Sequence, residues 1–215
     1  MHLFPSFTSS RKPRSILVIA AALLAISLFA FTATSANQAS AAPTASAHTP
    51  FLTLPFESTA RMQILSGWYY NGGGGFHGGI DFINGNYNRV SGWRTFPIIA
   101  AADGEACGNC SSRQGNAVFI KHKIDGITYY TYYGHMASIA NDIPLGSQSR
   151  TVYVKRGQYL GMAGGTGANG LLHLHFALMN ANSTPLDPYN IHRLRGSYPA
   201  PTQGQFPGIG WFLGN

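Results

Sequence analysis

Residues 170–179, GLLHLHFALM, place two histidines two positions apart in an otherwise apolar run. Alternate residues of a β-strand point to opposite faces of the sheet, so such a run has two different sides. One side is entirely apolar and consists of Leu172, Leu174, Phe176 and Leu178. The other side carries both imidazoles, whose Cα atoms lie about 6.6 Å apart at the usual rise of a strand. The segment therefore predicts a strand with a core face and a face on which His173 and His175 reach toward one point.

The rest of the chain favours an all-β fold. Short runs rich in β-branched and aromatic residues are separated by glycine turns, and they occupy residues 96–106, 116–136 and 151–179. Asp125 and Gly126 stand between two such runs and predict the turn of a β-hairpin. A total of 26 glycines and a charged fraction of only 10% agree with many turns and short strands. Beyond residue 41 no segment has a convincing 3.6-residue apolar period, so helices should be short or absent.

The first 41 residues predict a secretory signal peptide. Three basic residues, Arg11, Lys12 and Arg14, precede a long apolar run that ends among small residues. We expect cleavage after Ala41, with Ala36 as an alternative site and an uncleaved membrane anchor as a second alternative. The signal peptide implies an exported protein.

Three further regions follow the signal peptide. We expect a Pro/Ala/Ser/Thr linker at residues 42–50, one domain at 51–190 and a Pro/Gly-rich C-terminal extension at 191–215 that packs on the domain or trails it. These regions contain 11 basic and seven acidic residues, a net charge of +4. This balance suits a polyanionic cell surface and equally a soluble basic protein, and no dense Lys/Arg stripe indicates a nucleic-acid partner. The only cysteines, Cys107 and Cys110, predict a local disulfide rather than free thiols or a metal site.

Two further segments contain histidines that suit a metal site. In residues 71–82, NGGGGFHGGIDF, His77 and Asp81 are four positions apart and are flanked by glycines that discourage a helix. In residues 129–138, YYTYYGHMAS, His135 ends an aromatic β-type run. Imidazole nitrogens and carboxylate oxygens suit zinc at ~2.0–2.2 Å, and three protein ligands leave a fourth position for water.

The spacing allows two arrangements of these groups around one centre. In the first, His173 and His175 both bind the ion together with His77 and Asp81, which gives a closed structural site. In the second, only one histidine of the pair binds, and the other remains an acid/base group. Spacing alone leaves both arrangements open.

Four segments match a known family in their order along the chain: HGGID at 77–81, GHM at 134–136, GMAGGTGANG at 161–170 and HLHF at 173–176. Together they resemble the lysostaphin-like, or LytM-type, zinc metalloendopeptidases of the beta-lytic metallopeptidase family twenty-three. The resemblance extends from about residue 76 to residue 179 and implies a compact antiparallel β-sandwich of the duplicated hybrid motif type, with a zinc-containing groove. The chain departs from the family pattern in GANGLLHLHF, where Ser and Pro are usual before the histidines.

The resemblance also implies the role of each site residue. By the family pattern His77, Asp81 and His175 hold one zinc ion per chain, whereas His135 and His173 are catalytic. Tyr69 or Tyr70 is a further candidate for stabilising an oxyanion, although simple aromatic packing is the more economical interpretation.

The implied function is that of a secreted, cell-wall-associated bacterial endopeptidase. It would hydrolyse peptide bonds in peptidoglycan cross-links or in another glycine-rich peptide, and we expect a monomer without nucleic-acid partners, and without a membrane partner after signal cleavage. The alternative is a non-catalytic wall-binding or regulatory protein on the same fold. Such relatives usually lack some ligands, whereas all five positions are filled here.

Overall fold

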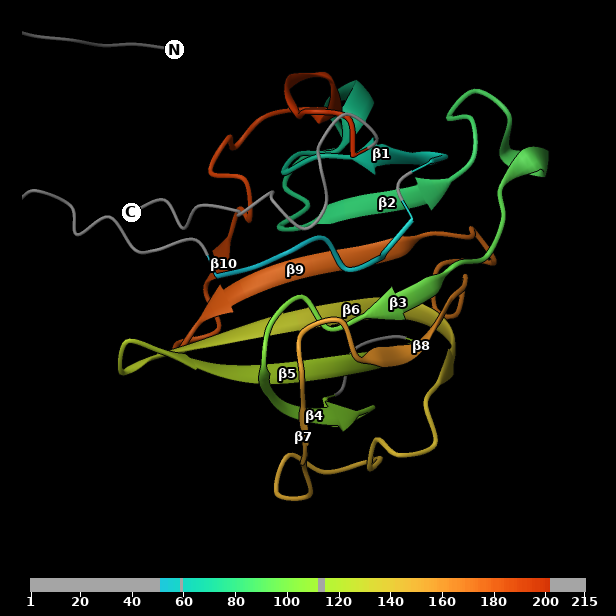
Figure 1. The fold of residues 1–215 in the computed structure, drawn as a ribbon. Coiled ribbons are helices and arrows are strands. Elements are labelled where there is room, and N and C mark those ends of the chain that lie inside the picture. The colour runs from blue at the N-terminus through green and yellow to red at the C-terminus, as the bar shows by residue number, and fades with distance from the viewer. Residues whose placement is uncertain (1–50, 59, 112–114, 202–215) are drawn as a thin grey trace, which may run out of the picture. The chain divides into compact units, whose positions relative to one another are not determined.

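The computed structural model describes residues 51–58, 60–111 and 115–201 (Figure 1). The predicted signal peptide, the linker and residues 202–215 of the predicted extension lie outside this part of the chain. The described strands are β1 (Met62–Ser66), β2 (Ile80–Asn84), β3 (Pro97–Ile99), β4 (Gly104–Gly108), β5 (Asn116–Ile124), β6 (Ile127–Ile139), β7 (Val152–Val154), β8 (Tyr159–Ala163), β9 (Leu174–Asn180) and β10 (Pro185–Leu186). The described helices are single 3-10 turns, η1 (Asn71–Gly73), η2 (Val90–Gly92) and η3 (Arg195–Ser197). Among these residues no helix is long and apolar enough to cross a membrane.

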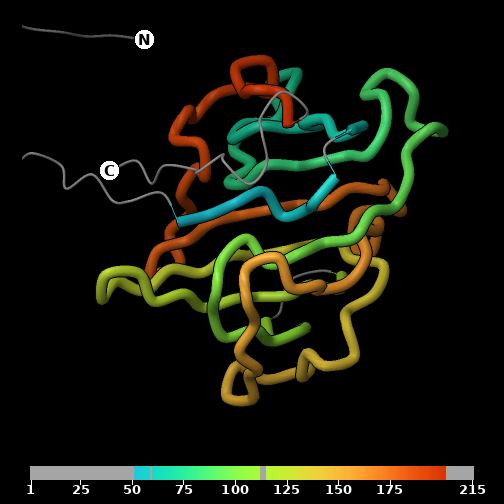
Figure 2. Tube along the Cα trace, viewed as in Figure 1, coloured from blue at the N-terminus to red at the C-terminus, as the bar shows by residue number. Residues whose placement is uncertain are grey.

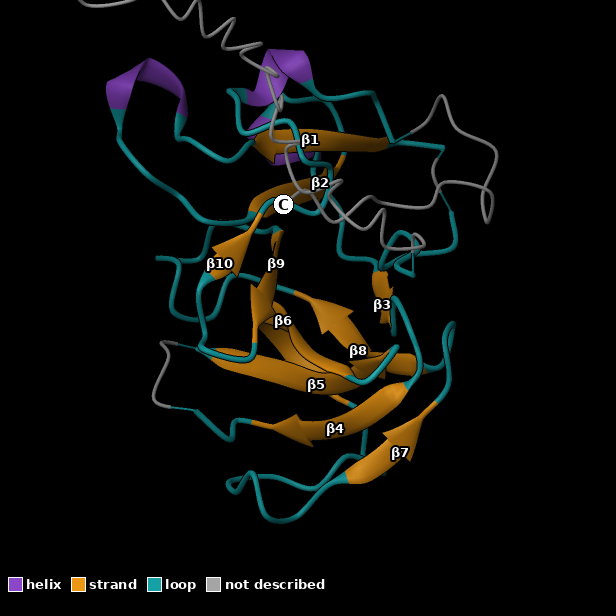
Figure 3. Cartoon of the chain, turned by 90° about the vertical axis from the view of Figure 1, so that its left-hand side faces the viewer, coloured by secondary structure: helices purple, strands orange, loops and turns teal. Residues whose placement is uncertain are grey.

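Antiparallel pairing joins the strands into one sheet in the order β1-β2-β9-β6-β5-β4-β7 (Figure 2). β10 pairs with β9, and β8 pairs with both β6 and β3 (Figure 3). Apolar side chains from β2, β9 and β6 share one buried cluster with Ile98 of β3 and Leu160 of β8. The predicted all-β, antiparallel fold is confirmed.

Two local predictions are also confirmed. Asp125 and Gly126 connect β5 to β6, since Ile124 pairs with Ile127 across the turn. Both turn residues have positive φ, 49° and 82°, which is the backbone geometry of a type I′ hairpin turn. Cys107 and Cys110 form a disulfide, with Cα atoms 5.9 Å apart.

β9 has the two faces that its sequence predicts, but it begins later than the alternation suggests. Leu174, Phe176 and Leu178 are fully buried in the main core. Asn169 and Gly170 have positive φ, 51° and 78°, and turn the chain just before the strand. His173 therefore precedes β9 and makes an isolated bridge with Gly164 instead.

β6 changes its pairing partner at His135. Tyr129 to Gly134 pair with β9, whereas Met136 to Ile139 pair with β8. His135 itself has a φ of 62°, in the left-handed region, and the register against β5 shifts at the same place. Irregularities of this kind bend a strand and redirect a side chain. The bend therefore decides where the His135 imidazole lies.

A buried histidine away from the other histidines predicts acid sensitivity of the fold. His122 is fully buried, its Nδ1 lies 2.7 Å from the Asp103 carbonyl oxygen, and burial lowers its pKa to about 4. In the unfolded chain the His122 ring takes up a proton near its ordinary pKa of about 6.5, whereas in the folded chain it stays neutral down to about pH 4. The free energy of unfolding therefore keeps its full value above pH 6.5 and falls as the pH falls from 6.5 toward 4. We expect wild type to lose about 2 kcal/mol more of its unfolding free energy than His122→Gln between pH 7.5 and pH 5. Urea unfolding at the two pH values measures this difference, and equal losses in both proteins would contradict it.

Candidate metal centre

The centre is built where β2 and β9 pair. Asp81 of β2 and His175 of β9 are direct cross-strand partners, which places their side chains next to each other. His77 lies just before β2, and the Gly78-Gly79 pair lets its segment approach β9 closely. A side chain on Gly79 would not fit, because its Cβ would lie 2.7 Å from Cε1 of His175. Gly79 is therefore a steric requirement of the site, and Gly78 has a φ of 75° that favours glycine.

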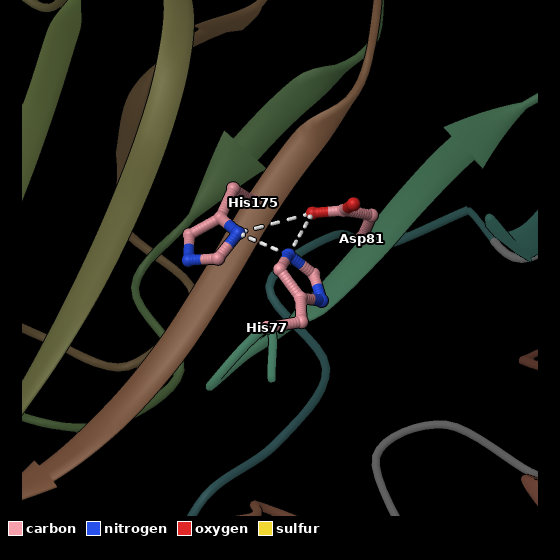
Figure 4. Close-up of side chains that lie close together, drawn as sticks. All are labelled: His77, Asp81 and His175. Atoms are coloured by element: carbon pink, nitrogen blue, oxygen red, sulfur yellow. Dashed lines mark hydrogen bonds and ion pairs between the residues drawn. The ribbon is translucent and has the colours of Figure 1, made fainter. Parts of the chain in front are cut away.

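Three side-chain atoms converge at this point (Figure 4). Asp81 Oδ1 lies 3.1 Å from His77 Nε2 and 3.0 Å from His175 Nδ1. The two ring nitrogens are 2.8 Å apart, and the Asp81 side chain is buried. Among the described residues, His77, Asp81 and His175 form a group whose ligand atoms are close enough together to hold a metal ion.

The electrostatics of the centre favour a cation. Burial raises the pKa of Asp81, but the His175 and His77 rings, which donate to its carboxylate when no metal is bound, outweigh it and hold that pKa far below its usual range. His77 Nδ1 lies 2.8 Å from the Gly67 carbonyl oxygen, which can only accept, so Nδ1 carries a proton and Nε2 is the nitrogen that faces Asp81 and would offer its lone pair to a bound cation. A carboxylate oxygen and imidazole nitrogens this close together require a proton or a cation between them. The N and O donors match those that zinc takes from proteins.

His173 and His135 lie beside these three residues. His173 Nε2 is 3.7 Å from Asp81 Oδ1, farther than either of the other histidine nitrogens. The His135 ring centroid is 4.7 Å from that of His173 and 6.0 Å from that of His175. All five residues selected from the sequence therefore gather at one place.

Backbone carbonyls orient both of these additional rings. His135 Nδ1 donates to the Thr166 carbonyl oxygen over 2.8 Å, and His173 Nδ1 donates to that of Leu171 over 2.7 Å. Each ring therefore carries its proton on Nδ1 when neutral and keeps a lone pair on Nε2. Sequence reasoning missed these partners, because any residue type supplies a carbonyl oxygen.

The two candidate tyrosines occupy different positions. The Tyr70 ring centroid lies 4.3 Å from that of His77, and burial, with a further contribution from the charge of Asp81, raises the pKa of its phenol. Tyr69 packs instead against Phe76, at 6.3 Å between ring centroids. Tyr132 was not predicted from the sequence as a site residue, and its ring centroid lies 5.7 Å from that of His175.

The region that contains the centre matches a known protein family. Residues 75–188 match the model of a peptidase family, Peptidase family M23. Because the match covers just over half of the chain and includes all five site residues, the chain belongs to peptidase family M23. No curated protein sequence matches the chain.

Several solved structures are similar to the chain. One is a zinc-containing peptidase from Vibrio cholerae, at 27% identity and a TM-score of 0.47, with 65% of this chain and 39% of that chain covered. Another is the catalytic domain of the antimicrobial peptidase lysostaphin from Staphylococcus simulans, at 26% and 0.40, with 66% and 95% covered. A third is the catalytic domain of a mutant of the prophage-encoded M23 protein EnpA from Enterococcus faecalis, at 25% and 0.46, with 63% and 95% covered. The similar region thus spans well under half of the Vibrio cholerae peptidase.

The centre predicts metal-dependent stabilisation that requires Asp81. Zn²⁺ at about 100 times its dissociation constant should stabilise wild type by about 2.7 kcal/mol, which raises the Tm by roughly 5–10 °C. Asp81→Asn keeps the side-chain shape but removes the charge, so most of this rise should be lost. The matched control is Asp103→Asn, which removes an exposed carboxylate outside the centre and should respond to Zn²⁺ like wild type. Thermal unfolding with and without Zn²⁺ measures the shift, and an unchanged response of Asp81→Asn would exclude Asp81 as a ligand.

Proposed function

We propose that this chain is a secreted zinc endopeptidase that hydrolyses peptide bonds in peptidoglycan cross-links. One observation carries the proposal. An ionised, buried Asp81 and ring nitrogens of His77 and His175 converge within 2.8–3.1 Å, while two further histidines stand beside them. Three ligands with acid/base groups nearby are the composition of a catalytic metal site rather than a structural one.

In this proposal His77 would bind zinc through Nε2, His175 through Nδ1 and Asp81 through Oδ1. A zinc ion bound there supplies a Lewis acid that activates water and polarises a peptide carbonyl. The Gly67 carbonyl oxygen, 2.8 Å from His77 Nδ1, keeps Nε2 directed at the centre. His173 is less suited to bind the ion than His77 or His175, because its Nε2 lies farther from Asp81 Oδ1 than their nitrogens do.

His135 and His173 would handle the proton. Burial lowers the pKa of His135, so its ring is neutral near pH 7 and its Nε2 can accept a proton from the attacking water. His173 has the same tautomer, set by the Leu171 carbonyl oxygen. One ring takes the proton while the other can donate a hydrogen bond to the developing oxyanion once it is protonated.

The substrate assignment is supported by the loops and by the family. Gly72, Gly73 and Gly75 precede His77, and a side chain on any of them would meet open space, so the glycines leave room for a peptide backbone. The glycine-rich residues 164–170 lie on the chain just before His173. An extended cross-link peptide suits such loops, and membership of a peptidase family supports a peptide as the substrate. Export follows from the signal peptide that residues 1–41 predict.

The two proton-handling histidines should be needed for turnover but not for zinc. His173→Ala and His135→Ala should each lower kcat by at least about 100-fold, the usual contribution of a general acid or base. Both variants should keep close to one zinc per chain by elemental analysis, whereas His175→Ala should lose zinc and activity together. Digestion of purified peptidoglycans with defined cross-link bridges measures the activity. Mass spectrometry of the released fragments then identifies the peptide bond that is cleaved.

Two outcomes would favour other interpretations. Loss of most of the zinc in His173→Ala would indicate the closed four-ligand site. A wild-type protein that binds peptidoglycan but neither holds zinc nor releases fragments would indicate a wall-binding or regulatory protein.

Tyr70 and Tyr69 offer a matched pair for testing oxyanion stabilisation. Tyr70 lies against His77, so Tyr70→Phe should lower kcat by about tenfold to 100-fold with little change in KM, because the lost hydrogen bond acts on the transition state. Tyr69→Phe removes the same hydroxyl from the neighbouring residue and should leave kcat unchanged. Steady-state kinetics on a soluble cross-link peptide separates the two, and equal effects would refute a role for Tyr70.

A further inference from the structure

Asp187 is a buried acidic residue outside the metal centre. The residue is 2% exposed, and no ion pair with it is found in the part of the chain that the structure describes. Four donors satisfy it: the Tyr198 hydroxyl at 2.6 Å and the backbone N–H groups of Tyr189, Ile191 and His192 at 3.0, 2.9 and 2.6 Å. Burying a carboxylate is costly unless such hydrogen bonds compensate it. Asp187 therefore fixes the turn that follows it and also fixes Tyr198.

Tyr198 carries this contact to a second segment of the chain. Its hydroxyl oxygen accepts from the backbone N–H of Trp68 over 3.3 Å. Its ring lies directly against Gly67, where a Cβ atom would come within 2.6 Å of Tyr198 Cε2 and 2.8 Å of the Arg193 carbonyl oxygen. The backbone at residues 67 and 68 is therefore held on one side by Tyr198 and its neighbours.

The other side of the same two residues contacts His77. The Gly67 carbonyl oxygen accepts from His77 Nδ1 over 2.8 Å. The Trp68 carbonyl oxygen accepts from the backbone N–H groups of His77 and Gly78 over 3.1 and 3.3 Å. Two consecutive peptide units thus connect Tyr198 to both the ring and the backbone of His77.

We propose that Asp187 and Tyr198 are positioning residues of the metal centre, which act through the Gly67 carbonyl oxygen on the orientation of the His77 ring. The inference rests on the proposed role of His77 as a zinc ligand. The family match ends at residue 188, so Tyr198 belongs to a part of the chain that the family model does not cover. Residues 189–198, which follow the matched domain, are on this account part of the machinery that binds the metal.

The physical effect depends on the orientation of the ring. With Gly67 in place, His77 Nδ1–H donates to its carbonyl oxygen and Nε2 faces Asp81. If residues 67 and 68 shift, Nδ1 loses its acceptor and the ring can rotate away from the centre. Disturbing the partner of a ligating histidine typically weakens metal binding by about 10-fold to 100-fold, and a residue one step more remote should act at the low end of that range.

Tyr198→Phe tests the proposal, with Tyr133→Phe as the matched control. Both changes remove a buried tyrosine hydroxyl that accepts from a backbone N–H, since the Tyr133 hydroxyl accepts from that of Ala101 over 2.9 Å. Tyr133 belongs to the main core and pairs with Phe176, not with the face that carries His175. Both variants should lower the Tm, but only Tyr198→Phe should raise the zinc dissociation constant, by about tenfold in competition with a chelator.

A second measurement makes the inference independent of hydrolysis. Long-range ¹H–¹⁵N correlation spectra of the zinc-loaded full chain report whether the His77 Nδ1–H keeps its hydrogen bond. Wild type and Tyr133→Phe should show a sharp, slowly exchanging Nδ1–H signal, and Tyr198→Phe should show a broadened or faster-exchanging one. An unchanged zinc affinity and an unchanged Nδ1–H signal in a folded Tyr198→Phe would overturn the positioning role even if wild type binds zinc and cleaves peptidoglycan. Wild type without zinc affinity would instead overturn the proposed function.

Discussion

The cross-strand pair of Asp81 and His175 is the contact on which the centre depends. Residues 94 positions apart become neighbours because β2 and β9 pair in a register that sets these two side chains opposite each other. The register is held from the other side of the sheet, where Ile80, Phe82 and Phe176 are buried in the main core. A slip of one residue would turn every side chain of β9 to the wrong face, so the hydrophobic pattern that folds the strand also places His175. The alternation of residues along β9 therefore sets both the packing of the core and the position of His175.

Three of the four clustered histidines follow a common arrangement. His77, His135 and His173 each donate Nδ1–H to a backbone carbonyl oxygen, so each neutral ring keeps its lone pair on Nε2. His175 differs, because its Nδ1 is the atom that faces Asp81. The backbone around the site thus serves as the outer shell that a histidine needs to act as a ligand or a base. Loops rather than strands supply these carbonyls, so the strands place the residues and the loops orient their rings.

The parts of this structure that follow from side-chain pattern were predictable, and the parts that depend on backbone contacts were not. Alternation in GLLHLHFALM predicted the core face of β9, and Asp125-Gly126 predicted the hairpin turn. The late start of β9 was missed because the chain leaves the turn at Asn169 and Gly170 only shortly before His173, which bridges Gly164 instead of continuing the strand. The change of partner at His135 depends on a left-handed φ in a residue whose type does not require one. The contacts of the ring nitrogens were also missed, because an accepting carbonyl has no residue signature.

Composition places a boundary at residue 190, but the physical contacts cross it. Pro and Gly become frequent beyond that position, which predicts an extension that packs on the domain or trails it. Yet Asp187 on one side and Tyr198 on the other share a 2.6 Å hydrogen bond in a buried position, and both contact the backbone of their own turn. Among the described residues no cation pairs with Asp187, so its burial would be costly if Tyr198 were removed. The hydrogen bonds of Asp187 therefore hold residues 187–198 together as one structural unit. The contact of this unit with residues 67 and 68 also fixes the backbone that binds His77.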